Sequence, residues 1–273
     1  MKTPNSLPLV TIIIPTKNAG KTLTLCLQSL KKQTYEKLEI IVADGGSTDN
    51  TISICKKFNV KILTVKSHIE RTTKKNLAAS SAKGEYVYFI DADFELQSNV
   101  IDECVNLCTK NYDAIIVPEK VYGYNSFWSR CRQLEVLCYN GDDLVESPRF
   151  IKKHVFMDVK GFDEQLIFGE ENDLCYRIRN SGYRVGRTKS WLYHHEGPVS
   201  SVILRKIYYG NTAFKYIKKQ RFDALARFQP IRLGWIHHRK LLGRYPSYAV
   251  GLFVLKFIQY LAAFLGLLIK FIR

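Results

Sequence analysis

Glu85-Tyr-Val-Tyr-Phe-Ile-Asp91-Ala-Asp93 is a short apolar stretch that ends in two carboxylates separated by one residue. Residues 86–90 are all aromatic or β-branched, a pattern typical of a strand buried on both faces of a parallel sheet. Asp91 and Asp93 then lie at the carboxyl end of the strand, where open α/β sheets bind their ligands. Two carboxylates suit Mg²⁺ or Mn²⁺, which usually also bind substrate phosphates. An ordinary polar turn is the alternative, because Asp is common in turns.

Strand-like and helix-like segments alternate before this stretch. The periodicity predicts strands at residues 9–15, 38–43, 61–65 and 85–91, and helices at 21–32, 48–58 and 72–82. This β-α-β-α-β-α-β order predicts an α/β fold with a mainly parallel, doubly wound sheet. Farther along, we expect helices at 99–110, 170–181 and 200–219, strands at 114–118, 183–187 and 191–195, and less regular structure over 119–150.

The positive charge is concentrated at the C-terminal end. The 273 residues have a net charge of +16, and residues 200–273 hold 14 Lys and Arg against one acid, Asp223. No nucleic-acid-binding module is recognisable in the sequence, so we expect no nucleic acid as a partner. Because the basic segment ends in an apolar one, an anionic membrane surface is the expected partner.

The cysteines and the N-terminus both bear on the cellular compartment. The seven cysteines form no Cys-x-x-Cys pair and are odd in number, which predicts reduced, mostly buried thiols in a cytosolic compartment. Residues 1–8 contain no apolar stretch of the kind that a secretory signal has. We therefore expect the catalytic part to stay on the cytoplasmic side.

Several short motifs resemble those of one enzyme family. They occur in the order Ile14-Pro-Thr-Lys-Asn18, Val42-Ala-Asp44-Gly-Gly-Ser47-Thr-Asp49, Lys75-Asn76-Leu-Ala78, Asp91-Ala-Asp93, Gly161-Phe-Asp-Glu164 and Gly169-Glu170-Glu171-Asn-Asp173-Leu174. In this order and spacing the chain resembles family 2 glycosyltransferases of the GT-A fold over roughly residues 9–215. The resemblance implies a nucleotide-sugar donor, a bound Mn²⁺ or Mg²⁺, and transfer with inversion at the anomeric carbon.

The resemblance also implies which residues bind the donor and the metal. Metal ligands would be Asp93, Asp91 through water, and His194. Adjacent strand residues point to opposite faces, so only one of His194 and His195 can bind the metal. His194 is preferred, and a packed structural histidine is the alternative. The nucleotide sugar would contact Pro15, Thr16, Asn18, Asp44, Lys75, Asp91 and Ala92. Read without the resemblance, Asp44 belongs to a helix-capping turn and Lys75 is a solvated charge.

The register of the last motif makes Glu171 the catalytic base, at a position where the family more often has Asp. Glu170 is the alternative base, and Asp173 is expected to position the loop. Arg149, with residues 120–150, is expected to shape the acceptor site. Without the resemblance, acids in the first turn of this helix and bases in its last turn simply complement the helix dipole.

Residues 248–269 are almost entirely apolar and long enough to cross a bilayer. A helix lying in the membrane interface is favoured over one that spans it, because one helical face holds Lys256, Gln259, Ala263 and, just beyond this segment, Lys270. A soluble packing helix would leave too much apolar surface in water. We expect a GT-A transferase domain over residues 1–220 and a basic linker with a membrane-associating helix over 221–273, on the cytoplasmic face.

These features predict a metal-dependent, inverting glycosyltransferase that moves one sugar to a lipid-linked saccharide acceptor of the polyprenyl or dolichyl type. The Gln-x-x-Arg-Trp motif of the family's processive synthases is absent from the sequence, which favours a single transfer. Rival hypotheses are a polyprenyl-phosphate sugar synthase, whose phosphate acceptor needs no base, and a catalytically silent membrane scaffold. A nucleotidyltransferase is disfavoured because Thr16-Lys-Asn-Ala-Gly20 is a poor phosphate loop.

Overall fold

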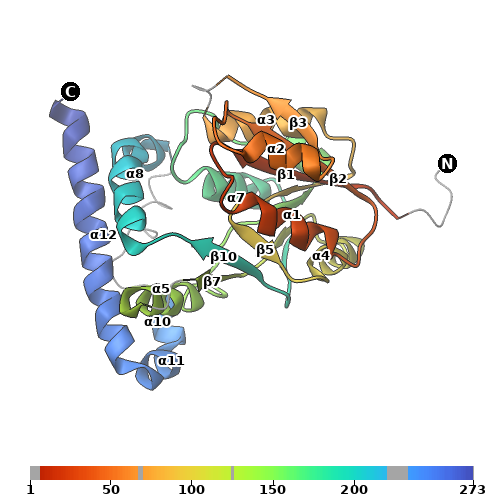
Figure 1. Ribbon diagram of the computed structural model, residues 1–273. Coiled ribbons are helices and arrows are strands. Elements are labelled where there is room, and N and C mark those ends of the chain that lie inside the picture. Colours follow the sequence, from red (N-terminus) through yellow and green to blue (C-terminus); the bar gives the residue numbers. More distant parts are fainter. Residues whose placement is uncertain (1–6, 67–69, 124–125, 220–232, 273) are drawn as a thin grey trace. The chain divides into compact units, whose positions relative to one another are not determined.

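The computed structural model describes residues 7–66, 70–123, 126–219 and 233–272 (Figure 1). The chain forms two compact units. Unit 1 comprises Met1–Pro118, Pro148–Glu164 and Leu174–Tyr193, and unit 2 comprises Glu119–Ser147, Gln165–Asp173 and His194–Arg273. The division passes through helix α7 (Glu170–Asn180) and strand β10 (Leu192–Glu196).

Unit 1 contains a seven-stranded mixed sheet. Its strands are β1 (Val10–Thr16), β2 (Leu38–Asp44), β3 (Lys61–Thr64), β4 (Tyr86–Phe89), β6 (Ala114–Ile116), β8 (Phe150–Lys152) and β9 (Val185–Arg187). The strand order is β3-β2-β1-β4-β8-β6-β9. All neighbours pair in parallel except β8, which is antiparallel to both β4 and β6. The predicted mainly parallel α/β sheet is confirmed.

Helices cover both faces of this sheet because its strands are apolar on both sides. Ile12 and Ile14 of β1 pack in one buried cluster with α1 (Leu23–Lys31) and α4 (Val100–Thr109). Ile13, between them, packs in a second cluster with α3 (Arg71–Ser81), α6 (Lys153–Asp158) and the later turns of α7. Helix α2 (Thr51–Lys57) adds Cys55 to the first cluster.

Strand β4 ends at Phe89, two residues before the predicted end at Asp91. After β4, the Ile90 N–H still donates to the Ile13 carbonyl at 3.1 Å, so the ladder reaches the residue before Asp91. Because β1 is parallel to both β2 and β4, the carboxyl ends of the three strands meet at one sheet edge. Short strand β5 (Phe94–Leu96) follows directly.

Unit 2 is mainly helical. Its described helices are α5 (Phe127–Leu137), α8 (Val199–Lys219), α10 (Leu233–His237), α11 (Arg239–Arg244) and α12 (Pro246–Ile272), and β7 (Glu119–Gly123) is hydrogen-bonded to β10. Helix α12 packs along α8 and α5 (Figure 1). Helices α8 and α12 confirm the predictions for residues 200–219 and for the apolar C-terminal segment. The first part of the predicted linker, residues 221–232, lies outside the described residues.

Residues 119–150 were predicted to be less regular, and this prediction is wrong for α5. The Ser126 hydroxyl caps this helix by accepting a hydrogen bond from the Ser129 N–H. The sequence does not show a regular apolar face for this helix, because its buried face includes the charged residues Arg132 and Glu135. Glu135 is 1% exposed. Burial of these charges depends on partners far away in the chain, which a local pattern does not reveal.

All seven cysteines are buried, and among the described residues none is joined in a disulfide. Cys26 lies beneath the Asp91 turn, and burial, reinforced by the charges of Asp93 and Asp91, raises the pKa of its thiol. The thiol is therefore held in its neutral form.

Candidate active site

Asp44 is built into the turn that follows β2. It pairs with Thr16 in the parallel register of β1 and β2, and the Thr16 hydroxyl donates to its Oδ1 at 2.9 Å. Its Oδ2 accepts the backbone N–H groups of Gly46 and Ser47 at 3.0 and 2.8 Å. The Ser47 hydroxyl also donates to Oδ1. This buried carboxylate therefore shapes the turn, and its predicted contact with the nucleotide remains a prediction.

Asn18 ties the loop after β1 to the same turn. It has the left-handed backbone conformation, with φ of 54°, which Asn tolerates better than most residues. Its N–H donates to Ser47 Oγ at 2.8 Å, and its Oδ1 accepts the Thr48 N–H at 2.8 Å. Two of the family motifs thus form one hydrogen-bonded surface at the sheet edge, next to buried Pro15.

Helix α3 brings two adjacent lysines to this region in different roles. Lys75, predicted to neutralise the diphosphate, is 1% exposed, and its ammonium lies 4.8 Å from the Phe162 ring centroid. Lys74, which the sequence did not single out, donates from Nζ to the Thr16 carbonyl at 3.2 Å. Burial lowers the pKa of Lys74, and the charge of Asp44 opposes that shift. Which of two neighbouring lysines faces the turn depends on how α3 packs.

Two arginines lie beside Asp91 of the D-x-D turn. Asp91 Oδ2 lies 3.4 Å from Arg149 Nη1, and Oδ1 lies 3.8 Å from Arg71 Nη1. Arg149 also stacks on Phe94, with 4.8 Å between its guanidinium carbon and the ring centroid. Arg149 had been predicted on the acceptor side, and Arg71 was not predicted at all. The only sequence signal for Arg71 was its place in the first turn of α3, a helix that begins near the carboxyl ends of the sheet strands.

Asn76 joins two further motifs. Its side-chain NH₂ donates to the Phe162 carbonyl and to Glu164 Oε1, both at 2.9 Å, and its Oδ1 accepts the Phe162 N–H at 2.9 Å. Gly161 has φ of 63°, and a side chain there would meet Asn76 Oδ1. The Lys75-Asn76 motif therefore holds the Gly161-Phe-Asp-Glu164 turn in place.

The donor set at the D-x-D turn fits a divalent cation that also binds a diphosphate. Asp91 and Asp93 are only partly buried, and Ala92 between them is buried. Among the described residues, no group of three or more His, Cys, Asp and Glu side chains is arranged to hold a metal. Mg²⁺ and related ions are commonly held by one or two carboxylates with substrate phosphates and water. Asp93 and Asp91 are therefore the residues that would hold such a cation, and the metal itself remains a prediction.

The candidate base segment lies in unit 2, at the start of α7. Glu170 is buried and Glu171 is partly buried. Asp173 is fully buried, and its Oδ1 lies 3.0 Å from the Lys219 ammonium at the end of α8. Asn172 donates to Ser147 Oγ at 2.8 Å. Asp173 thus ties the start of α7 to the end of α8, and its predicted role in positioning the loop remains a prediction.

Gly169 is required immediately before these carboxylates. Its φ is 77°, and a Cβ there would lie 2.6 Å from Tyr216 Cδ2. We expect Gly169→Ala to lower the free energy of unfolding by about 1 to 2 kcal/mol through the left-handed conformation alone. Because the ring of Tyr216 must also shift, kcat should fall by about tenfold or more.

Gly182→Ala is the matched control for this variant. Gly182 has φ of 82°, and nothing lies within 4 Å of the position of its Cβ. Gly182→Ala should therefore show the loss of stability that comes from the left-handed conformation, without the shift of Tyr216 and with kcat unchanged. Equal kcat values for the two variants would contradict a role of the Gly169–Tyr216 contact in positioning the base segment.

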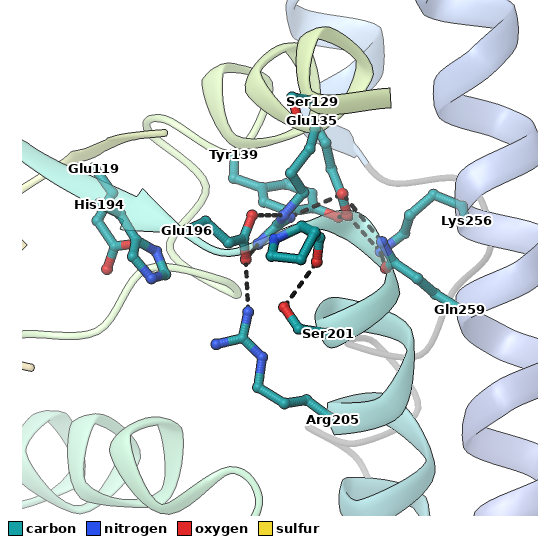
Figure 2. Close-up of polar contacts among 12 residues, drawn as sticks. Glu119, Ser129, Glu135, Tyr139, His194, Glu196, Ser201, Arg205, Lys256 and Gln259 are labelled. Carbon is teal, nitrogen blue, oxygen red and sulfur yellow. Dashed lines mark hydrogen bonds and ion pairs between the residues drawn. The ribbon is translucent and has the colours of Figure 1, made fainter. Parts of the chain in front are cut away.

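The two histidines at the end of β10 have separate neighbours. His194 Nδ1 lies 3.8 Å from Glu119 Oε2, and the two side chains face each other in Figure 2. The His195 ring makes an edge contact with Tyr122. The two residues point to opposite faces, as expected for adjacent strand positions. The predicted role of His194 as a metal ligand remains a prediction.

Comparisons with known proteins define the class of this protein. The model of glycosyl transferase family 2 matches residues 11–166, more than half of the chain. The chain therefore belongs to glycosyl transferase family 2, and its fold is the GT-A fold.

Particular relatives agree with this assignment. Glycosyltransferase GlyG of Streptococcus pneumoniae is 35% identical over 122 residues, a match that covers 43% of this chain and only 40% of GlyG. Among solved structures, mannosyltransferase PcManGT from Pyrobaculum calidifontis, in complex with GDP-Man and Mn²⁺, matches with a TM-score of 0.67 at 18% identity over 97% of this chain and 88% of that one. S. aureus TarS 1-349 in complex with UDP-GlcNAc matches with a TM-score of 0.60 at 20% identity, over 91% and 81% of the two chains.

Proposed function

We propose that this chain is a metal-dependent, inverting glycosyltransferase that moves one sugar from a nucleotide-sugar donor to a lipid-linked saccharide. The observation that carries the proposal is the Asp91-Ala-Asp93 turn at the carboxyl end of β4, flanked by Arg71 and Arg149, in a member of glycosyl transferase family 2. The fold shared with proteins solved with GDP-Man and UDP-GlcNAc supports a nucleoside-diphosphate sugar as the donor.

Unit 1 supplies the donor-binding groups. Thr16, Asn18 and the Asp44 turn form a rigid edge on which the nucleoside can lie. Arg71 and Arg149 bring positive charge next to the D-x-D turn, where a diphosphate would need it. Following the family resemblance, Asp93 would be the direct metal ligand, and Asp91 would contribute through water. A bound Mn²⁺ or Mg²⁺ would stabilise the charge that develops on the leaving diphosphate.

The start of α7 supplies the proton acceptor. Glu171 takes the proton of an acceptor hydroxyl while that oxygen attacks the anomeric carbon of the donor sugar. The bond from this carbon to the diphosphate oxygen breaks, and its electron pair leaves with the nucleoside diphosphate. A single displacement of this kind inverts the anomeric centre. These carboxylates favour a hydroxyl acceptor over the phosphate acceptor of a polyprenyl-phosphate sugar synthase, which needs no base.

The C-terminal region supports a membrane-held acceptor. Helix α12 contains Pro246–Ile269, a segment long and apolar enough to cross a membrane. The preceding chain is strongly basic, which suits an anionic surface on the cytoplasmic side. A soluble donor and a membrane-associated enzyme together favour an acceptor anchored by a polyprenyl or dolichyl chain. In this proposal, residues 1–220 form the transferase domain and residues 221–273 the membrane-associating part.

A thermal-shift panel tests donor and metal binding directly. The chain is mixed with UDP-, GDP- and dTDP-sugars, each with Mn²⁺, Mg²⁺ or EDTA. A ligand present at a hundred times its dissociation constant stabilises the folded state by about 2.7 kcal/mol. We expect one nucleotide to raise the melting temperature in a metal-dependent way, and Asp93→Ala to abolish the rise. A panel with no response, repeated in lipid nanodiscs with the same result, would support a silent scaffold.

A further inference from the structure

The outer face of α12 is a continuous apolar stripe. Its side chains are between 40% and 65% exposed and recur at the three- and four-residue steps of one helical face: Val250, Phe253, Phe257, Leu261, Phe264 and Leu268. In water, such a stripe would be an unusually large exposed apolar surface, and surfaces of this kind mark contacts with a membrane or another protein.

The opposite face of α12 holds Lys256 and Gln259, and both are hydrogen-bonded to Glu135 of α5. Lys256 Nζ donates to Glu135 Oε1 at 2.7 Å and to Gln259 Oε1 at 3.2 Å. Figure 2 shows both side chains reaching from α12 toward Glu135. Lys256 is 9% exposed and Gln259 is 3% exposed. The polar face of the apolar helix is thus turned inward and satisfied by the protein.

Glu135 is the centre of a larger buried network. It also accepts the Tyr139 hydroxyl at 2.7 Å and lies 2.8 Å from Arg132 Nη1. Arg132 Nε in turn lies 2.9 Å from Glu196 of β10. Burial alone would raise the pKa of Glu135, but the charges of Lys256 and Arg132 outweigh it and hold this pKa well below its usual range. Removing Lys256 from the network would leave a buried anion short of its partner.

Helix α12 is also held by close backbone contact with α8. A side chain at Gly210 would lie 1.9 Å from the Ala263 carbonyl, and one at Gly266 would lie 1.9 Å from the Ile207 carbonyl. These two glycines allow the helices to approach closely at two points less than one helical turn apart, Ile207 and Gly210 on α8 and Ala263 and Gly266 on α12. Helix α12 is therefore a packed part of unit 2, with one face against α8 and α5.

We infer that the exposed stripe of α12 is a docking surface for an anionic lipid bilayer, on which the helix lies in the interface without crossing it. This inference rests on the membrane association in the proposed function and specifies its geometry. Spanning would require Lys256 and Gln259, near the middle of the helix, to leave Glu135 and enter hydrocarbon. Lying flat buries the apolar stripe and keeps the network intact.

Charge complementarity identifies the occupant as an anionic surface. Residues 200–273 contain 14 basic residues and one acidic residue. Exposed Arg239, Lys240 and Arg244 lie in or at the end of α11, directly before the first turn of α12. Basic residues beside an apolar helical face are typical of helices that bind anionic headgroups. A second copy of this strongly basic chain would instead bring like charges together.

Vesicle flotation of the full chain tests the docking surface. The protein should float with phosphatidylcholine vesicles that contain phosphatidylserine and bind far less to phosphatidylcholine alone. The double variant Phe257→Asp/Phe264→Asp should reduce the bound fraction by about tenfold or more, because both rings leave the lipid. Met157→Asp is the control for an added surface carboxylate, since Met157 is an exposed apolar residue on α6 in unit 1.

Thiol labelling distinguishes docking from spanning. Ser247→Cys and, separately, a cysteine appended after Arg273 are treated with a membrane-impermeant maleimide in sealed inside-out vesicles from the expressing cells. The buried native cysteines set the background. Labelling of both positions without detergent supports side-on docking. Labelling of only one position would overturn the inference in favour of a span.

Two further outcomes would also overturn the inference. Equal flotation of the double variant and the wild type would exclude the stripe as the docking surface. Absence of lipid binding, with a concentration-dependent dimer that Phe257→Asp/Phe264→Asp abolishes, would assign the stripe to a second copy. The donor-induced thermal shift is measured on the same samples. Because it depends on unit 1, loss of lipid binding with an intact shift would refute the docking surface and leave the proposed transferase standing.

Discussion

Asp93→Asn is expected to reduce kcat by about 10³-fold or more while leaving the fold intact. The substitution keeps the size of the side chain but removes the negative charge that would hold the cation against the leaving diphosphate. Asp93 is partly exposed and follows the end of β4, so the change removes no core packing. The check is the rate of nucleoside-diphosphate release as the Mn²⁺ or Mg²⁺ concentration is varied, together with the thermal melting curve.

The control for Asp93→Asn is Glu95→Gln, two residues along the chain. Glu95 is also a partly buried carboxylate, and it lies within β5. Glu95→Gln changes the local charge by the same amount as Asp93→Asn. Because Glu95 is not a predicted metal ligand, the metal dependence of kcat should stay unchanged. If Asp93→Asn kept wild-type kcat and metal response, the D-x-D turn would be an ordinary polar turn, and metal dependence would have to be withdrawn.

Glu171→Gln is expected to lower kcat by about 10² to 10⁴-fold, since general-base catalysis typically contributes that much. The amide cannot accept the proton of the acceptor hydroxyl. In the wild type, kcat should rise with pH as the base loses its proton, and this limb of the pH profile should disappear in the variant. The Michaelis constant for the donor should change little, because the donor-binding groups lie in unit 1.

Glu170→Gln separates the two candidate bases. Glu170 is buried at the first position of α7, and Glu171 is less buried. We expect Glu170→Gln to lower stability but to keep the pH-dependent limb of kcat. The reverse pattern would make Glu170 the base. Full activity of both variants would favour the polyprenyl-phosphate sugar synthase, whose acceptor is already ionised.

The sheet and its ligand-binding edge were predictable because their signals are local. The β-branched runs at Val10–Thr16 and Leu38–Asp44 define strands to within a residue or two of the observed ends. A run of buried aromatic and β-branched residues followed by Asp91 and Asp93 identifies the edge. Each of these patterns depends on the preferences of consecutive residues, so no knowledge of distant contacts is needed.

The charges around the candidate site were less predictable. Arg71 and Arg149 are 78 positions apart, yet both lie beside Asp91. Lys74 and Lys75 are adjacent and chemically identical, yet one contacts the Thr16 carbonyl and the other the Phe162 ring. Their contacts depend on how α3 is rotated about its axis where it packs on the sheet. The spacing of apolar residues in the sequence does not fix that rotation closely enough to separate two neighbouring residues.

The sequence by itself determined the family, the α/β fold, the D-x-D edge and an apolar C-terminal helix with its polar residues on one face. Only the tertiary structure decided what that polar face does. Lys256 meets Glu135, 121 residues earlier, and Arg132 meets Glu196, 64 residues later. The free energy of a buried charge depends on whether a partner lies within a few ångströms. That proximity arises from folding, and it leaves the apolar stripe of α12 as the outward face.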